Sequence, residues 1–237
     1  MSLKKIIIFY PSFEKGGVEI ILVNLIDFFL KKRINVTLIS SNFPKKFSKN
    51  KLFNYREFKP LKSIFPARLS RAFSASSLLL DELNKSDSDN TIVFSLQSSS
   101  ISILISKIFG FKIIVRNAED PIYSTYYADN KVLALIAIVS KFLTYNFANG
   151  IITNSIGSKR SLSKFIFSNK ITSIYNPYIK DKFKIKSKTK RKNVILSVGR
   201  LTKQKDFQTL IKAFSLVNKK IKNHKLIIIG DGEKKNE

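Results

Sequence analysis

The sequence has 237 residues, of which 43 are lysine or arginine and 16 are aspartate or glutamate, so its formal net charge is +27. Apolar residues make up 44% of the chain, which is enough for a hydrophobic core and excludes a disordered tail. The chain has no cysteine and one histidine, which excludes disulfides, cysteine nucleophiles, thiolate metal sites and multi-histidine metal sites. The absence of cysteine fits a reducing compartment.

The strong positive charge has two interpretations. One is a polyanionic partner: nucleic acid, an anionic membrane surface or phosphorylated ligands. The other is a lysine-rich composition in which lysine fills most exposed positions. Lysines occur along the whole chain, which favours the second interpretation for most of them. The exception is residues 180–192, where eight basic residues stand against one aspartate.

Hydrophobic periodicity predicts alternating strands and helices in the first three quarters of the chain. Apolar runs predict strands at residues 5–10, 35–40, 91–96, 112–116, 150–154 and 171–175. Amphipathic patterns predict helices at residues 17–32, 65–84, 99–109, 129–148 and 158–167. In the first helix the expected buried positions are Val18, Ile21, Leu22, Leu25 and Phe29. Strands this rich in isoleucine and valine need cover on both faces, so we expect a Rossmann-like, doubly wound parallel sheet.

A second, incomplete α/β unit is expected after this sheet. Residues 180–192 read as a basic linker, and residues 193–237 as one β-α-β unit with a strand at 194–198, a helix at 207–221 and a strand at 225–230. One helix covers only one face of two strands, so this unit is too small to form a domain alone. The expected organisation is therefore a domain at residues 1–179, a linker at 180–192 and the beginning of a second Rossmann-like domain at 193–237.

Glycines follow the first strand of each predicted unit. Gly16 and Gly17 open the first helix, and such a turn either cradles a phosphate or simply connects the strand to the helix. Gly199 and Arg200 end the strand of the second unit, and Lys205 precedes its helix. Ligands of open α/β sheets bind beyond the carboxyl ends of the strands, where an arginine and a lysine suit a diphosphate. On charge alone, however, these are two basic residues among 43.

Two further segments are candidates for binding. Arg116 and Asn117 end a strand and are plausible ligand contacts, although the following Glu119 and Asp120 also fit a capped loop. Residues 61–80 combine basic and apolar side chains at helical spacing, which fits either an anionic membrane surface or a helix packed on the sheet. No apolar stretch approaches the ~20 residues that a spanning helix needs; the longest, residues 132–139, is far shorter.

Three stretches resemble family 4 glycosyltransferases of the GT-B fold. The first contains Gly16-Gly17-Val18-Glu19, and the second runs from residue 152 to residue 177. The third contains Gly199-Arg200-Leu201, then Lys205, and ends at Gly230-Asp231-Gly232. The resemblance covers almost the whole chain in the order of the family.

The resemblance implies a retaining transferase that moves a sugar from a nucleotide-diphosphate sugar to a glycan or lipid-linked acceptor in surface polysaccharide synthesis. Arg200, Lys205 and Gly199 would bind the donor diphosphate, with Gly16 and Gly17 facing the same phosphates or the acceptor. Neither a metal nor a cofactor is expected. Arg116 and Asn117 stand where many members place a catalytic-site histidine, as in a subset that acts on lipid-linked or polysaccharide acceptors.

The resemblance also bears on the activity and location of this chain, and one alternative function remains beside it. The family's second domain continues beyond the point where this sequence ends and carries an acidic donor-binding motif there, so we expect weak or no transfer by this chain alone. The expected location is cytoplasmic, with peripheral contact to an anionic membrane and no nucleic-acid partner. The alternative is a non-catalytic, basic Rossmann-like protein that binds RNA or an anionic membrane.

Overall fold

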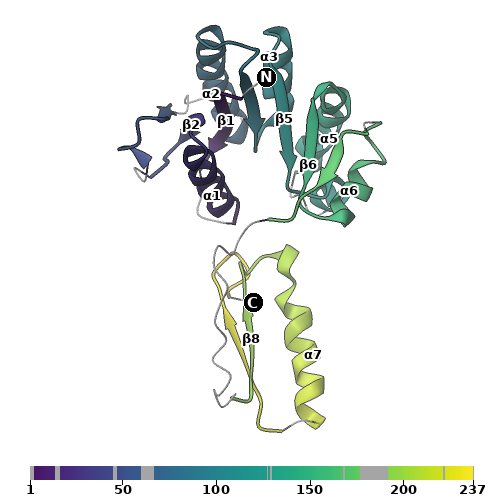
Figure 1. Ribbon diagram of the computed structural model, residues 1–237. Coiled ribbons are helices and arrows are strands. Elements are labelled where there is room, and N and C mark those ends of the chain that lie inside the picture. Colours follow the sequence, from purple (N-terminus) through teal and green to yellow (C-terminus); the bar gives the residue numbers. More distant parts are fainter. Residues whose placement is uncertain are drawn as a thin grey trace. The chain divides into compact units, whose positions relative to one another are not determined.

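The chain divides into two compact units, residues 1–180 and residues 181–237, which are described separately. The computed structural model describes residues 3–13, 17–44, 47–59, 67–126, 128, 130–167, 169–176, 192–220 and 222–236. Figure 1 shows helices beside a twisted sheet in the first unit and one helix, α7, beside two strands in the second.

The first unit is built on a parallel sheet of seven strands in the order β3-β2-β1-β4-β5-β6-β7. The strands are β1 (Lys5–Ser12), β2 (Asn35–Ser41), β3 (Phe53–Glu57), β4 (Thr91–Ser95), β5 (Lys112–Asn117), β6 (Gly150–Thr153) and β7 (Ile171–Ser173). The strand order reverses between β1 and β4, which are paired in parallel. The expected Rossmann-like, doubly wound parallel sheet is therefore confirmed, and its crevice lies beyond the carboxyl ends of these two strands.

Helices cover the two faces of this sheet and create two hydrophobic cores. The helices are α1 (Gly17–Lys31), α2 (Ala67–Asn84), α3 (Ser99–Ile108), α4 (Pro121–Tyr126), α5 (Lys131–Thr144) and α6 (Ile156–Leu162). Because side chains alternate along a strand, Ile8 of β1 packs with α1 in one core while Ile7 packs with α2 and α3 in the other. Both isoleucines are fully buried, so both faces of the central strand are covered.

The sequence patterns did not predict one strand, β3, and one helix, α4. β3 has the sequence FNYRE, which lacks the apolar run that marked the other strands, and its residues are only half-buried or exposed at the edge of the sheet. The short helix α4 begins at Pro121, and the side chain of Asp120 caps it by accepting hydrogen bonds from the backbone N–H groups of Ile122 and Tyr123 at 2.9 and 3.2 Å. Sequence analysis placed Asp120 in a capped loop, although an aspartate followed by a proline also starts helices.

The predicted helix at residues 129–148 is shorter in the structure. It begins at Lys131 after Asn130, whose side-chain oxygen accepts a hydrogen bond from the Leu133 N–H at 3.0 Å. It ends at Thr144 and is followed by a 3-10 turn, η2 (Tyr145–Phe147). Tyr145 is buried in the core although the helix before it is mostly exposed.

The second unit is a single parallel β-α-β unit. Strand β8 (Val194–Val198) pairs with β9 (Lys225–Ile229), and α7 (Phe207–Lys220) connects them after the 3-10 turn η3 (Lys203–Lys205). Among the described residues of this unit, none is buried. Val198 is 70% exposed and Leu196 is 59% exposed, so one face of the two strands carries uncovered apolar side chains.

Candidate functional site

A pocket of about 570 Å³ lies at the carboxyl ends of β1, β4 and β5 in the first unit. The pocket is lined by Tyr10 of β1, by residues 96–100 between β4 and the first turn of α3, and by residues 116–119 at the end of β5, and α5 closes one side. The pocket therefore sits where the strand order reverses, which is the usual ligand position in an open parallel sheet. Its wall is mainly apolar, with polar groups converging from the strand ends.

Arg116 and Asn117 are the last two residues of β5 and are held in this wall. Both are buried, with 6% and 3% of their surface exposed. Arg116 donates from Nη2 to Oδ1 of Asn176 at 2.7 Å, and Asn117 donates from Nδ2 to the backbone carbonyl of Glu119 at 2.5 Å. A nearly buried guanidinium keeps its charge, so it places a fixed positive charge at the wall of the pocket.

Tyr10 and Glu19 form a buried pair beside the pocket that the sequence did not reveal. The phenolic O–H of Tyr10 donates to Oε1 of Glu19 at 2.6 Å, and both residues are less than a tenth exposed. Sequence analysis named Glu19 only as part of the Gly16-Gly17-Val18-Glu19 stretch. In the structure, its hydrogen bond joins α1 to the carboxyl end of β1. Gly17 is the exposed first residue of α1, whereas Gly16 lies outside the described residues.

The two acidic residues after β5 have different surroundings. Glu119 lines the pocket, while Asp120 caps α4. Asn154, which directly follows β6, ties down the turn after β5, because its Nδ2 donates to the Ala118 carbonyl at 2.9 Å. This hydrogen bond helps to set the position of the pocket wall.

The serine-rich segment after β4 forms a hydroxyl network. Ser102 donates to Ser95 at 2.9 Å, Ser95 lies 3.1 Å from the hydroxyl of Ser99, and all three residues are buried. Ser98 occupies the N-cap position of α3 in a left-handed conformation, but its side chain makes no capping hydrogen bond.

In the second unit, the predicted diphosphate-binding residues share one loop between β8 and α7. Gly199 follows β8 directly, while Arg200 and Lys205 are exposed to solvent. A Cβ on Gly199 would lie 3.3 Å from the Phe207 ring at the start of α7, so only glycine lets the strand end approach this helix without a shift. Lys205 ends the turn η3, and its N–H donates to the Thr202 carbonyl at 3.0 Å.

A second glycine loop, at the end of β9, supports the first. Leu201 donates its N–H to the Asp231 carbonyl at 2.9 Å and accepts a hydrogen bond from the Lys234 N–H at 3.0 Å. A Cβ on Gly230 would stand 1.9 Å from the Gly199 carbonyl oxygen, so this position tolerates no side chain in the present backbone. Gly232 has a φ of +156° and packs against the Leu201 backbone.

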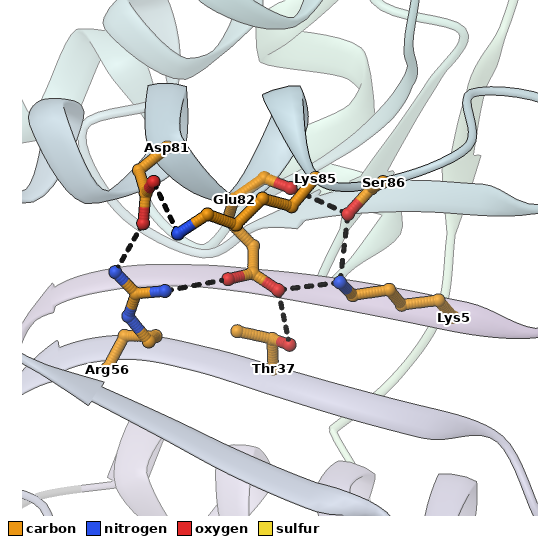
Figure 2. Close-up of polar contacts among 7 residues, drawn as sticks. All are labelled: Lys5, Thr37, Arg56, Asp81, Glu82, Lys85 and Ser86. Atoms are coloured by element: carbon orange, nitrogen blue, oxygen red, sulfur yellow. Dashed lines mark hydrogen bonds and ion pairs between the residues drawn. The ribbon is translucent and has the colours of Figure 1, made fainter.

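A cluster of charged side chains lies near the other end of β1 from the pocket, beside the end of α2 (Figure 2). Glu82 accepts hydrogen bonds from Lys5 at 2.6 Å, Thr37 at 3.0 Å and Arg56 at 3.1 Å, and only 4% of its surface is exposed. Hydrogen bonds from Lys85 and then Arg56 hold the pKa of the neighbouring Asp81 below its usual value. Each carboxylate is paired with two cations, and the cluster ties α2 to three strands, which indicates a structural role.

The segment proposed for membrane contact, residues 61–80, is described from residue 67 onward and forms α2. Its Ala72, Ala75 and Leu79 are buried in the core, and Arg71 donates to the Ser12 hydroxyl at 3.1 Å. The described part therefore packs on the sheet. Across the part of the chain that the structure describes, no helix is long and apolar enough to cross a membrane. Within the same residues, no three histidine, cysteine, aspartate or glutamate side chains gather into a metal-binding group.

Comparisons with known proteins agree with this architecture. Residues 179–237 match the family model for glycosyl transferases group 1. An uncharacterized glycosyltransferase from Methanocaldococcus jannaschii is 33% identical over 151 residues, which cover 57% of this chain and 36% of that protein. The match thus spans little more than a third of the length of this relative.

Solved structures show the same fold at low sequence identity. TarM is 12% identical, with a TM-score of 0.66 over 99% of this chain and 73% of its own, and a mutant from S. aureus was crystallised with Fondaparinux, alpha-GlcNAc-glycerol and UDP. HepE from Anabaena, in complex with UDP and glucose, is 16% identical, with a TM-score of 0.63 over 97% of this chain and 61% of its own.

Proposed function

We propose that this chain, a glycosyltransferase of group 1 with the GT-B fold, belongs to an enzyme that transfers a sugar from a nucleotide-diphosphate sugar to a glycan or lipid-linked acceptor. The observation that carries the proposal is the loop of Gly199, Arg200 and Lys205, which lies inside the residues that match the family. Both cations are exposed between a strand end and a helix start, where an α/β sheet receives phosphates.

In the proposed mechanism, Arg200 and Lys205 hold the donor diphosphate. Arginine forms paired hydrogen bonds with phosphate oxygens, whereas lysine adds a compact charge. As the glycosidic bond breaks, negative charge grows on the departing diphosphate and the sugar becomes oxocarbenium-like. Cations already in place stabilise this charge without reorganising during the reaction. We further propose retention of the anomeric configuration, with Gly16 and Gly17 contacting the phosphates or the acceptor.

We assign the acceptor to the pocket of the first unit, with Arg116 and Asn117 as its site residues. The buried guanidinium of Arg116 is fixed by Asn176, and Glu119 is a carboxylate in the same pocket wall. A mainly apolar wall with these few polar groups suits an acceptor that joins a sugar or phosphate to a lipid. Surface polysaccharide synthesis at the cytoplasmic face of a membrane is the setting that we propose for this reaction.

Donor binding is tested by measuring the affinity of the chain for UDP, GDP and ADP by calorimetry and thermal shift. We expect one of the three to bind, and Arg200→Ala to weaken it by about tenfold or more, because one charge-assisted phosphate contact contributes about 1.5–3 kcal/mol. Lys205→Ala should weaken the same binding.

Lys203→Ala is the matched control, because Lys203 is an exposed lysine of the same turn to which no role is assigned. Its affinity should stay within about twofold of the unmodified chain. The proposal fails if none of the nucleotides binds, or if the Lys203 and Arg200 variants lose affinity equally. A thermal shift with RNA alone would favour the non-catalytic, RNA-binding alternative.

A further inference from the structure

The helix α5 carries a stripe of exposed apolar side chains, while Leu133 and Ile138 on its other side are half-buried and line the pocket. Six apolar residues spaced along one side of the helix are each 45–68% exposed: Val132, Leu135, Ile136, Val139, Phe142 and Leu143. The buried residue of this helix is Thr144, and Ser140 receives a hydrogen bond from Ser100 of α3 at 3.2 Å. This is the reverse of the pattern that a helix on a water-soluble surface shows.

The neighbouring helix α4 extends this apolar surface with aromatic side chains. Tyr123 and Tyr126 are 63% and 70% exposed, and Ile122 is 40% exposed. Lys131 joins the two helices, because its ammonium donates to the Tyr126 carbonyl at 2.5 Å and lies 5.7 Å from the centre of the Tyr126 ring. We call the six residues of α5 and these three residues of α4 the α4–α5 face.

Positive charge accompanies this face. Residues 121–176 contain six lysines and arginines and one acidic residue, Asp129. The helix α6 packs against α4 and carries the exposed cations Lys159 and Arg160. Exposed apolar residues with tyrosines and lysines at their borders are typical of a helix that lies in the interface of an anionic membrane.

The face also leads to the proposed acceptor pocket. Ile136 belongs to the face and lines the pocket, and Leu133 and Ala137 of the same helix line it as well. An acceptor anchored in a lipid layer beneath α5 would therefore enter the pocket without crossing water. This link to the acceptor rests on the proposed function, whereas docking itself depends only on the surface.

We propose that the α4–α5 face docks on an anionic lipid bilayer. The helix α5 lies parallel to the bilayer, since its 14 residues are fewer than the ~20 that span one. Its apolar side chains enter the interface, and the cations of α6 approach the lipid phosphates. The positive charge near the face attracts an anionic bilayer, whereas it would repel a second copy of this equally cationic chain. The tyrosines at the border of the face also favour the bilayer.

Docking is tested by co-sedimentation of the full chain with vesicles of phosphatidylglycerol and phosphatidylcholine, without nucleotide. We expect binding that weakens with salt and is lost on phosphatidylcholine alone. Replacing Leu135 and Val139 together by serine should lower the partition coefficient by about tenfold or more, because two apolar side chains leave the lipid. The control replaces Ile20 and Phe28, which are similarly exposed on α1, and should retain binding within about twofold.

A charge reversal gives the second arm. Lys159→Glu with Arg160→Glu should weaken binding to anionic vesicles, whereas Lys49→Glu with Lys51→Glu, an exposed pair before β3, should weaken it less. Circular dichroism checks that each variant is folded. The proposal is overturned if the chain does not bind anionic vesicles, or if the serine substitutions on α1 and on α5 weaken binding equally. It is also overturned if light scattering shows a dimer that only the α5 substitutions convert to a monomer. Nucleotide affinity, measured separately on the same samples, reports on the proposed function.

Discussion

At the scale of single residues, the polar groups that shape the first unit come from distant parts of the sequence. Arg116 donates a hydrogen bond to Asn176, and Tyr10 donates one to Glu19. Glu82 accepts hydrogen bonds from cationic side chains of two strands. The sequence singled out Arg116 and Glu19 but gave no sign of their partners, and it gave no sign of Glu82. Their roles follow from burial, because a buried charge must be paired and hydrogen-bonded to be tolerated.

Glu82 should be the most sensitive of these residues for stability. Glu82→Ala leaves the largely buried cations of Lys5 and Arg56 without their shared carboxylate. Removal of one partner from a buried ion pair costs about 3–5 kcal/mol, which corresponds to a fall in Tm of roughly 6–20 °C for a unit of this size. Thermal unfolding followed by circular dichroism measures the change.

Asp81→Ala is the control for Glu82, since Asp81 binds Arg56 and Lys85 from a more exposed position. Its effect on Tm should be clearly smaller, because solvent screens an exposed ion pair. Equal losses in the two variants would contradict the structural role assigned to the buried carboxylate.

At the scale of elements, periodicity located most of the helices and part of what they bury. For α1, the expected Ile21 and Leu22 are buried, and the expected Val18, Leu25 and Phe29 are partly buried against the same core. Ile26 and Leu30 are buried in addition. For α5 the periodicity predicted a helix, and only the structure shows that its apolar stripe is exposed.

The loops at the ends of β8 and β9 give a prediction at this scale. Gly230→Ala would place a Cβ against the Gly199 carbonyl, so one loop must shift, at a cost of about 1–3 kcal/mol. We expect faster hydrogen exchange at residues 199–201 and weaker nucleotide binding. Gly157→Ala is the control, because its Cβ would meet only the Ser155 hydroxyl at 3.8 Å within α6. Unchanged exchange in the Gly230 variant would show that the two loops do not support each other.

At the scale of the whole molecule, the two units differ in how much they bury. The first has two hydrophobic cores around a seven-stranded sheet, whereas the described residues of the second include none that is buried. The free energy of unfolding depends on the buried apolar area, so we expect the two units to differ in their free energies of unfolding.

Hydrogen exchange followed by mass spectrometry checks this difference. We expect amides of β1, β4 and β5 to exchange at least about tenfold more slowly than those of β8 and β9, because core strands open only with global unfolding. Peptides from residues 128–148 provide an internal comparison, as they combine an exposed helix with the buried Tyr145. Equal protection of β8 and β1 would contradict the expectation.

The sequence by itself determined the doubly wound sheet and the glycine-bearing loop with Arg200 and Lys205, because strand and helix periodicity and turn glycines are local properties of the chain. It missed β3, whose edge position demands little apolar character, and the short helix α4. Only the tertiary structure decided which charges are paired, that Arg116 and Asn117 line a pocket with α5, and that the apolar side of α5 faces outward. These features depend on residues far apart in the chain, and no local pattern specifies which of them folding will bring together.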